Sequence, residues 1–203
     1  MLDTASTTCG TNHHKPTTLV AETYKSMTDA FFYEDYRTLK RTTAITESQR
    51  KDIKRQRRKQ IIAQRRIDPV LSIEKGTWYF LTINSLAQMV YGLKRMGEPC
   101  LEHVGNNFSP VPSKYIQEFI QMRNEILQLI NRACHAEAMA LIRDDADKVK
   151  LQLSDYRQTI IHDIQSKQLN IESMTVFLNL VQESQQLLSA LRHTVRGANK
   201  FDE

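Results

Sequence analysis

The sequence contains few residues that favour tight turns, with six Gly and five Pro among its 203 residues. Both residue types dominate the short connections of hairpins, so their scarcity leaves few turns with which to build a sheet of short strands. Runs of β-branched residues are short as well, and no segment has the pattern of a strand. The composition therefore favours a fold made of long helices.

Cysteines, a secretory signal and long apolar runs are equally scarce. Cys9, Cys100 and Cys134 are odd in number and lack C-x-x-C spacing, which is typical of reduced thiols in a cytosolic protein. Residues 1–18 contain no apolar stretch that could act as a signal peptide. The most apolar window, WYFLTINSLAQMVYGL, is too short to cross a bilayer and includes several polar residues. We therefore expect a soluble polypeptide.

Apolar side chains recur at helical spacing along most of the chain. A first helix is predicted from Leu19 with Leu39 still in its pattern, and the charged segment that follows can also be helical because Arg, Lys, Gln and Glu are good helix formers. Pro99 lies inside a later stripe that includes Phe80, and it predicts a kink or a break there. Further helices are expected at about 72–104, from 113, at 138–168 and at 172–196. These segments predict an all-α antiparallel helical bundle.

The two halves of the sequence resemble each other. MTDAFFYEDYRTLKR, from Met27, can be laid over INRACHAEAMALIRD, from Ile130, and FLTINSLAQMV over FLNLVQESQQL further on. Each half then consists of a helix, a short interruption, a long charged helix and a long return helix with an apolar stripe. We interpret this as two tandem three-helix units, 18–108 and 109–203, after a flexible leader at 1–17, although two helical hairpins could also resemble each other by chance.

Positive charge is concentrated in one segment. The stretch from Arg50 to Arg66 holds nine of the 28 basic residues and one of the 23 acidic ones, so the rest of the chain has 19 basic and 22 acidic residues. Three interpretations stay open: a solvated helix face, a contact for an anionic membrane or an acidic partner, and a contact for nucleic acid or polyphosphate. Nucleic acid is the least favoured, since the segment has no interleaved aromatics. The candidate contact residues are Lys51, Lys54, Arg55, Arg57, Arg58, Lys59, Arg65 and Arg66.

One constellation could begin a metal site. Glu98, Glu102 and His103 put two carboxylates and an imidazole near one helical turn, a set that a divalent cation or iron accepts. A hard cation needs further oxygen ligands, and the sequence predicts none there. In the alternative interpretation, both carboxylates face solvent and His103 packs near the following loop.

No motif for catalysis is present. The sequence has no G-x-S-x-G, no glycine-rich phosphate loop and no grouping of His, Cys and Asp that would activate a nucleophile. Cys100 and Cys134 fall on or beside apolar stripes, where a buried and inert thiol is expected. We therefore predict a protein without enzymatic activity and without a cofactor.

Two three-helix units in tandem are the architecture of the PhoU family, helical regulators of bacterial phosphate uptake. The stretches YKSMTDAFFYEDYRTLKR, LTINSLAQMVYGLKRMGEPCLEHVGNNFSPVP and FLNLVQESQQLLSALRHTVR resemble the cytosolic PhoU-like tail of certain bacterial inorganic phosphate transporters. In those tails, a helix ending in PCLxHVxNNxxPxP leads into the second unit. The resemblance covers about residues 20–200, and the matching motif residues are Pro99, Cys100, Leu101, His103, Val104, Asn106, Asn107, Pro110 and Pro112.

The resemblance implies a non-catalytic regulatory or scaffolding domain, attached to or acting on a membrane-embedded transporter of the sodium/phosphate type. Its place would be the cytoplasmic face of the inner membrane, with a role in phosphate transport and homeostasis. We expect such a domain to dock to the transporter or to a second copy, for which Tyr33 and Tyr36 are spare apolar positions. The alternative, from a different class, is a free-standing helical adaptor or nucleic-acid-associated protein that uses residues 50–66.

The sequence departs from the family at the metal sites. PhoU proteins bind metal clusters through repeated acidic pairs of the form Glu/Asp-x-x-x-Asp in each half, and here only Glu98 and Glu102 approach this spacing. Laid over the second half, these positions fall at Val195 and Asn199. The resemblance therefore implies the fold of the family without its metal clusters.

Overall fold

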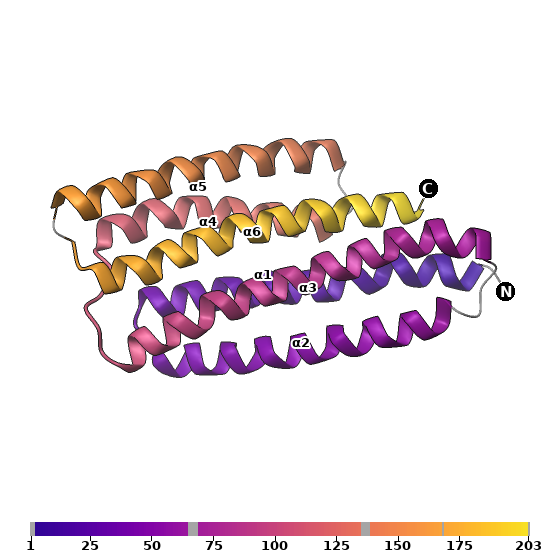
Figure 1. The fold of residues 1–203 in the computed structure, drawn as a ribbon, viewed down its shortest axis with the longest axis horizontal. Helices are drawn as coiled ribbons and strands as arrows, with labels where there is room; N and C mark the ends of the chain where they lie inside the picture. Colours follow the sequence, from indigo (N-terminus) through magenta and orange to yellow (C-terminus); the bar gives the residue numbers. More distant parts are fainter. Residues whose placement is uncertain (1–2, 65–68, 135–138, 168, 203) are drawn as a thin grey trace.

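The computed structural model describes residues 3–64, 69–134, 139–167 and 169–202, with side chains described for 16–59, 76–133, 140–167 and 169–197. Over these residues the regular structure is entirely α-helical, so the predicted all-α class is confirmed. None of the described helices has an apolar window long enough to cross a bilayer. The helices are α1 (Asp3–Phe32), α2 (Tyr36–Gln64), α3 (Pro69–Gly105), α4 (Ser113–Cys134), α5 (Met139–Lys167) and α6 (Ile171–Asp202) (Figure 1).

The helices lie side by side in an elongated bundle, and successive helices run in opposite directions (Figure 1). Helices α1, α2 and α3 contact one another, and so do α4, α5 and α6. The two sets meet along α3 and α6, which form the most extensive interface, and along α1 and α4, with a smaller contact between α1 and α6. Over the described residues, α2 and α5 contact only helices of their own set, so they are the outer helices. The boundary predicted between residues 108 and 109 falls in the connection from α3 to α4.

The buried helix faces form one apolar core. Phe119 of α4 packs edge-on against Phe32 of α1 and Phe177 of α6, with ring centroids 5.9 and 5.7 Å apart. Tyr156 of α5 packs edge-on against the same Phe177 at 6.3 Å. Edge-to-face pairs add to the stabilisation that burial alone provides, so this cluster ties four helices together. Other fully buried side chains include Tyr24, Met27, Leu39, Leu86, Leu93, Met96, Ile126 and Ile130.

Helix α1 begins at Asp3, so residues 3–17 are helical where the sequence predicted a flexible leader. Pro16 lies inside this helix, and Thr17 is buried. Extending an existing helix fixes few further dihedrals for each hydrogen bond gained, whereas starting a new helix is costly. The polar, Thr-rich stretch can therefore continue the helix that the apolar pattern from Leu19 specifies.

Two helices end through the same left-handed turn. Glu34 follows α1 with φ 54°, and Asn107 follows α3 with φ 53°. In both turns the next N–H donates to the carbonyl five residues earlier, at 2.8 Å for Asp35 and 3.2 Å for Phe108. This pattern satisfies carbonyls that a helix end leaves without donors. Asn tolerates this conformation, and the third helix, which was expected to end at about residue 104, ends at Gly105.

The turn at Glu34 divides an apolar pattern that the sequence assigned to one helix. Asp35 starts α2 by accepting hydrogen bonds from the Thr38 hydroxyl at 2.6 Å and from the Thr38 N–H at 3.0 Å. These two bonds lower the pKa of Asp35 and cap the new helix. Leu39 belongs to α2 and is fully buried, and its position also fits the helical spacing of the apolar residues in α1. The sequence pattern therefore gives no sign that one helix ends at Glu34 and another begins.

Pro99 lies inside α3 and does not break it: the helix continues past the proline to Gly105. Proline has no N–H, so the carbonyl four residues earlier, that of Arg95, loses its helical donor. Asn179 of α6 supplies a replacement, since its Nδ2 donates to the Arg95 carbonyl oxygen at 2.9 Å. The Arg95 guanidinium also pairs with Glu183 of α6 at 2.8 Å. Helix α6 thus compensates for the proline, and of the kink or break predicted at Pro99, the break does not occur.

Helices α3 and α6 approach closely at Gly197. A Cβ atom there would lie 2.3 Å from the Thr82 hydroxyl oxygen, 3.1 Å from the Trp78 carbonyl oxygen and 3.2 Å from the Thr82 amide nitrogen. The backbone atoms cannot yield unless the two helices separate. At Gly92, also on α3, a Cβ atom would meet only the flexible ends of Glu183 and Arg95, at 3.6 and 3.9 Å.

We predict that Gly197→Ala destabilises the protein by about 1–3 kcal/mol, the usual cost of overpacking, although Ala is the better helix former. Gly92→Ala is the matched control. Because Ala has the higher helix propensity, this variant should have the same free energy of unfolding as the wild type or one that is higher by up to about 1 kcal/mol. Urea unfolding followed by circular dichroism measures both. Equal effects of the two substitutions would contradict the close approach at Gly197.

We also predict that Asn179→Ala costs about 0.5–1.5 kcal/mol, because the Arg95 carbonyl loses its donor. The cost should shrink in a Pro99→Ala background, where the new backbone N–H at position 99 can bond to that carbonyl. Comparing both backgrounds cancels the helix propensity of the introduced Ala. The compensation is refuted if Asn179→Ala has the same effect on the free energy of unfolding in both.

Candidate functional site

Helix α2 carries the basic segment and buries a stripe that is mostly polar. The stripe can be buried because most of its polar groups have partners, the exception being Gln49 Oε1, which accepts no hydrogen bond from the described residues. The hydroxyls of Thr42 and Thr46 each donate to a carbonyl of α2 at 2.9 Å, and Gln49 donates to the Thr23 hydroxyl of α1 at 2.9 Å. With this stripe turned inward, the basic side chains are left on the outer surface of the bundle. The buried residues, three and four apart, are Leu39, Thr42, Thr46, Gln49 and Ile53.

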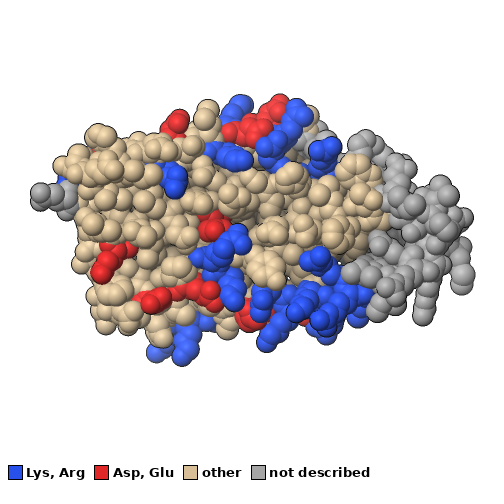
Figure 2. All heavy atoms as spheres, viewed as in Figure 1, with Lys and Arg blue, Asp and Glu red and all other residues tan. Residues whose placement is uncertain are grey.

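The structure places six of the eight candidate contact residues on this outer surface, which we call the basic face of α2. Arg57 is half-buried and the other five are exposed. Figure 2 shows a group of Lys and Arg side chains along the edge of the bundle that α2 forms in Figure 1. Arg65 and Arg66 lie outside the described residues. The basic face consists of Lys51, Lys54, Arg55, Arg57, Arg58 and Lys59.

Few acidic groups neutralise the basic face. Arg55 pairs with Asp52 in the preceding turn of α2. At the edge of the face, Arg50 pairs with Glu47 at 2.6 Å, and its hydrogen bond lowers the pKa of the Glu47 carboxyl. None of the other five residues of the face pairs with a carboxylate among the described side chains. The unpaired charges therefore remain available to an external anion.

Two aromatic rings of α3 adjoin the basic face. The guanidinium carbon of Arg57 lies 5.3 Å from the centroid of the Phe80 ring, and that of Arg50 lies 5.8 Å from the centroid of the Tyr91 ring. Phe80 is 48% exposed and Tyr91 37%, so Phe80 is not in the buried stripe that the sequence pattern predicted. Sequence reasoning missed both rings because they come from another helix. In the sequence, Phe80 and Tyr91 are separated by about three helical turns, and this spacing indicates that both rings lie on the same side of α3.

A small groove lies between α2 and α3 beside the basic face. Its volume is about 110 Å³. Three cationic side chains from α2 line it, together with small or apolar side chains from both helices; we call the buried apolar residues Ile53, Ala87 and Val90 its floor. The lining residues are Arg50, Ile53, Lys54, Arg57, Ala87, Val90 and Tyr91. The groove can therefore accept an anionic group that is attached to apolar material.

The three candidate metal ligands do not form a site in the structure. Glu98 and Glu102 are exposed, whereas His103 is only 2% exposed. The Nε2 atom of His103 is 3.1 Å from the Ser109 carbonyl oxygen in the following loop, a hydrogen bond that holds the ring there. Among the described residues, no group of three or more His, Cys, Asp or Glu side chains is placed to hold a metal ion. This is the arrangement of the alternative interpretation, with the carboxylates in solvent and the histidine packed.

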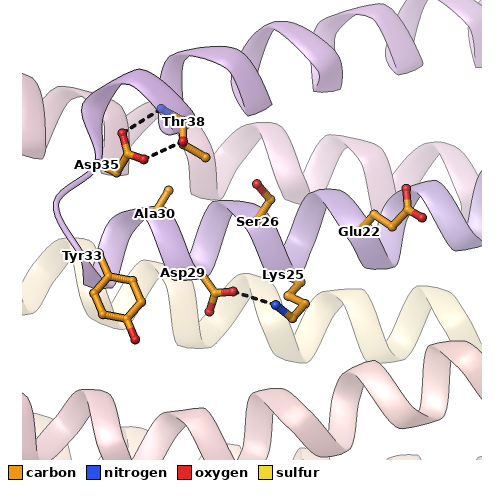
Figure 3. A pocket seen from close by; sticks show the side chains of 8 residues that line it. All are labelled: Glu22, Lys25, Ser26, Asp29, Ala30, Tyr33, Asp35 and Thr38. Atoms are coloured by element: carbon orange, nitrogen blue, oxygen red, sulfur yellow. Dashed lines mark hydrogen bonds and ion pairs between the residues drawn. The ribbon is translucent and has the colours of Figure 1, made fainter.

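A polar hollow of about 390 Å³ lies along α1 and the start of α2 (Figure 3). At its centre, Lys25 pairs with Asp29 at 3.0 Å, and the buried Arg123 of α4 pairs with the same Asp29 at 2.5 Å. Burial acts to raise the pKa of Asp29, but the two cations outweigh burial and lower it. Asp35 caps α2, and Figure 3 shows these side chains directed at their partners. The hollow therefore does not bring a free acid and base together.

The one cysteine whose side chain is described is buried as predicted. Cys100 is fully buried in α3, and burial raises the pKa of its thiol well above the ordinary range. A thiol of this kind stays protonated and unreactive. The side chain of Cys134 lies outside the described residues.

Comparison with known proteins finds no similar chain. No family model matches it, and neither the curated proteins nor the solved structures contain a match.

We predict that the double substitution Glu98→Gln with Glu102→Gln leaves any effect of Zn²⁺ or Mn²⁺ on the thermal midpoint unchanged. The exposed carboxylates and the buried imidazole do not share a ligand position, so removing the carboxylates should remove no metal site. Thermal melts of both proteins with and without metal check this, and binding by histidines elsewhere would be common to both. A metal-induced rise in midpoint that occurs only in the wild type would contradict it.

Proposed function

We propose that this chain is a non-catalytic, PhoU-like regulatory or scaffolding domain that acts on an inorganic phosphate transporter of the sodium/phosphate type. The observation that carries the proposal is the pattern of helix contacts. Helices α1–α3 contact one another, α4–α6 do the same, and the two sets meet along α3–α6 and α1–α4. This pattern supports two three-helix units in tandem, which is the architecture that the sequence resemblance implies.

The pairing of the two sets supports an internal duplication. Each of the two larger joining interfaces puts a helix against its counterpart in the other set, the third against the sixth and the first against the fourth. An internal two-fold axis produces such self-matching contacts. The faint similarity between the two halves of the sequence is the remnant expected of such an event.

The mechanism we propose is mechanical. The aromatic cluster and the Arg123–Asp29 pair bind the two sets into one rigid body. Lys25 and Asp29 in the polar hollow are paired with each other, while the basic face of α2 is open to solvent. A domain built in this way acts by where it docks, and its position at the cytoplasmic face of the membrane biases the gating of the transporter.

Phosphate uptake tests the proposal. Initial rates of labelled phosphate uptake are compared in cells that contain the chain, in cells from which its coding sequence is deleted, and in deleted cells complemented with it. We expect a change of about fivefold or more on deletion, the lower end of typical couplings between sites. Complementation should restore the rate, and sulfate uptake, the control, should not change. Isolation from solubilised membranes should recover an inorganic phosphate transporter with the chain.

The opposite outcome favours the alternative function. Unchanged phosphate uptake on deletion, together with recovery of the chain in a complex with nucleic acid that dissociates steeply as salt rises, would indicate a nucleic-acid-associated adaptor. Unchanged uptake together with a stable protein complex that lacks any transporter would indicate a helical adaptor of another kind.

A further inference from the structure

We propose that the groove between α2 and α3 is a binding site for the phosphate group of an anionic membrane lipid, with Arg57 as its principal ligand and Lys54 and Arg50 beside it. The inference rests on the proposed function, because it names the membrane contact of the same domain. It goes beyond a general attraction of positive charge to a membrane, since it assigns the contact to defined side chains with fixed geometry.

Arg57 is held ready to bind an anion. Its guanidinium lies over the Phe80 ring at 5.3 Å, and no described carboxylate pairs with it. A guanidinium supported by a ring loses less freedom on binding than a solvated lysine, and its N–H groups can contact two phosphate oxygens at once. Arg50 lies near Tyr91, but Glu47 neutralises part of its charge. Lys54 lines the groove with both arginines and adds a mobile cation.

The groove matches an amphiphilic anion better than a free one. Its floor consists of the buried residues Ile53, Ala87 and Val90, and the cations line the same groove. A phospholipid carries its phosphate next to hydrocarbon, so both parts of the groove are used. Inorganic phosphate would contact the cations alone and make no contact with the apolar floor.

Two observations favour a membrane over nucleic acid. The Phe80 and Tyr91 rings are partly exposed beside the cations, and aromatic side chains flanked by basic ones suit the boundary between headgroups and acyl chains. One face of each ring is already covered by a guanidinium, which reduces its use as a stacking platform for bases. Outside residues 50–66 the chain has more acidic than basic residues, so an anionic surface would also orient the domain with α2 toward it.

Substitutions that conserve charge separate a defined site from diffuse attraction. The full chain is sedimented with phosphatidylcholine vesicles that contain or lack phosphatidylserine, and we expect binding to the anionic vesicles only. Arg57→Lys and Phe80→Leu leave the net charge unchanged, yet each should weaken vesicle binding about two- to fivefold, the range expected for an exposed cation–π contact. The double variant should bind more tightly than the product of the two single losses predicts, because the shared cation–π contact is lost only once.

Matched controls accompany these variants. Lys51→Arg lies on the same face, also conserves charge and should bind like the wild type. Lys51→Gln removes one charge and should weaken binding about fivefold, as expected for one basic residue near an anionic surface. Circular dichroism melts establish that every variant is folded, and Phe80 tolerates substitution because it is half exposed.

Three results would overturn the inference. In the first, Arg57→Lys and Phe80→Leu bind like the wild type while Lys51→Gln binds more weakly, which means diffuse charge without a site. In the second, inorganic phosphate displaces the chain from vesicles far more effectively than sulfate at equal ionic strength, which means a site for free phosphate. In the third, a single-stranded oligonucleotide binds more tightly than the vesicles at the same salt concentration, which means a nucleic-acid contact.

The two experiments also separate this inference from the proposed function. Vesicle sedimentation uses the isolated chain, whereas phosphate uptake uses cells. Absence of vesicle binding with normal control of uptake would refute the lipid site alone. Specific vesicle binding without any effect of deletion on uptake would refute the transporter function alone.

Discussion

The packing of α3 against α6 is the constraint on which the remaining structure depends. This interface joins the two sets of helices, and both partners are long, with 37 residues in α3 and 32 in α6. It combines a close backbone approach at Gly197, an ion pair between Arg95 and Glu183, and the bond from Asn179 to a carbonyl that Pro99 leaves without a donor. Helices α2 and α5 attach to the outside of this central pair, so the position of the basic face follows from it.

Buried polar groups fix the register of the helices. The Tyr24 hydroxyl of α1 bonds to the Ser184 hydroxyl of α6 at 2.8 Å, and the Tyr115 hydroxyl of α4 donates to Asp163 of α5 at 2.8 Å. Apolar stripes tolerate a slip by one helical turn, because one Leu or Ile resembles another. A slip would leave the Tyr24 and Tyr115 hydroxyls buried without these partners, which is costly, whereas Ser184 and Asp163 would keep the contacts they make with Leu180 and Lys167 of their own helices. The polar contacts thus select one alignment among several that the apolar core would accept.

The class of fold follows from the sequence because helical periodicity is a local signal, and the stripes beyond residue 72 lie where the helices are. The errors arose where distant residues decide the outcome. Pro99 is accommodated by a side chain 80 positions away, and Leu39 continues the phase of a helix to which it does not belong.

The basic residues of the candidate site could be predicted, since a charged segment with few apolar residues must lie on the surface of the bundle. Their aromatic neighbours could not, because Phe80 and Tyr91 reach them only through the packing of α3. The candidate metal ligands point in different directions because adjacent positions on a helix face different ways, so that Glu102 lies in solvent and His103 points inward.

The place of α6 in the chain has a consequence for biosynthesis. It is the last of the described helices, yet it covers the broadest interface of α3 and supplies the donor for the Arg95 carbonyl. While the ribosome is still making it, the preceding helices have an uncovered apolar strip along their longest member. Such strips are what chaperones bind and what drives aggregation. A nonsense mutation that removes α6 would therefore damage the first set of helices as well as the second.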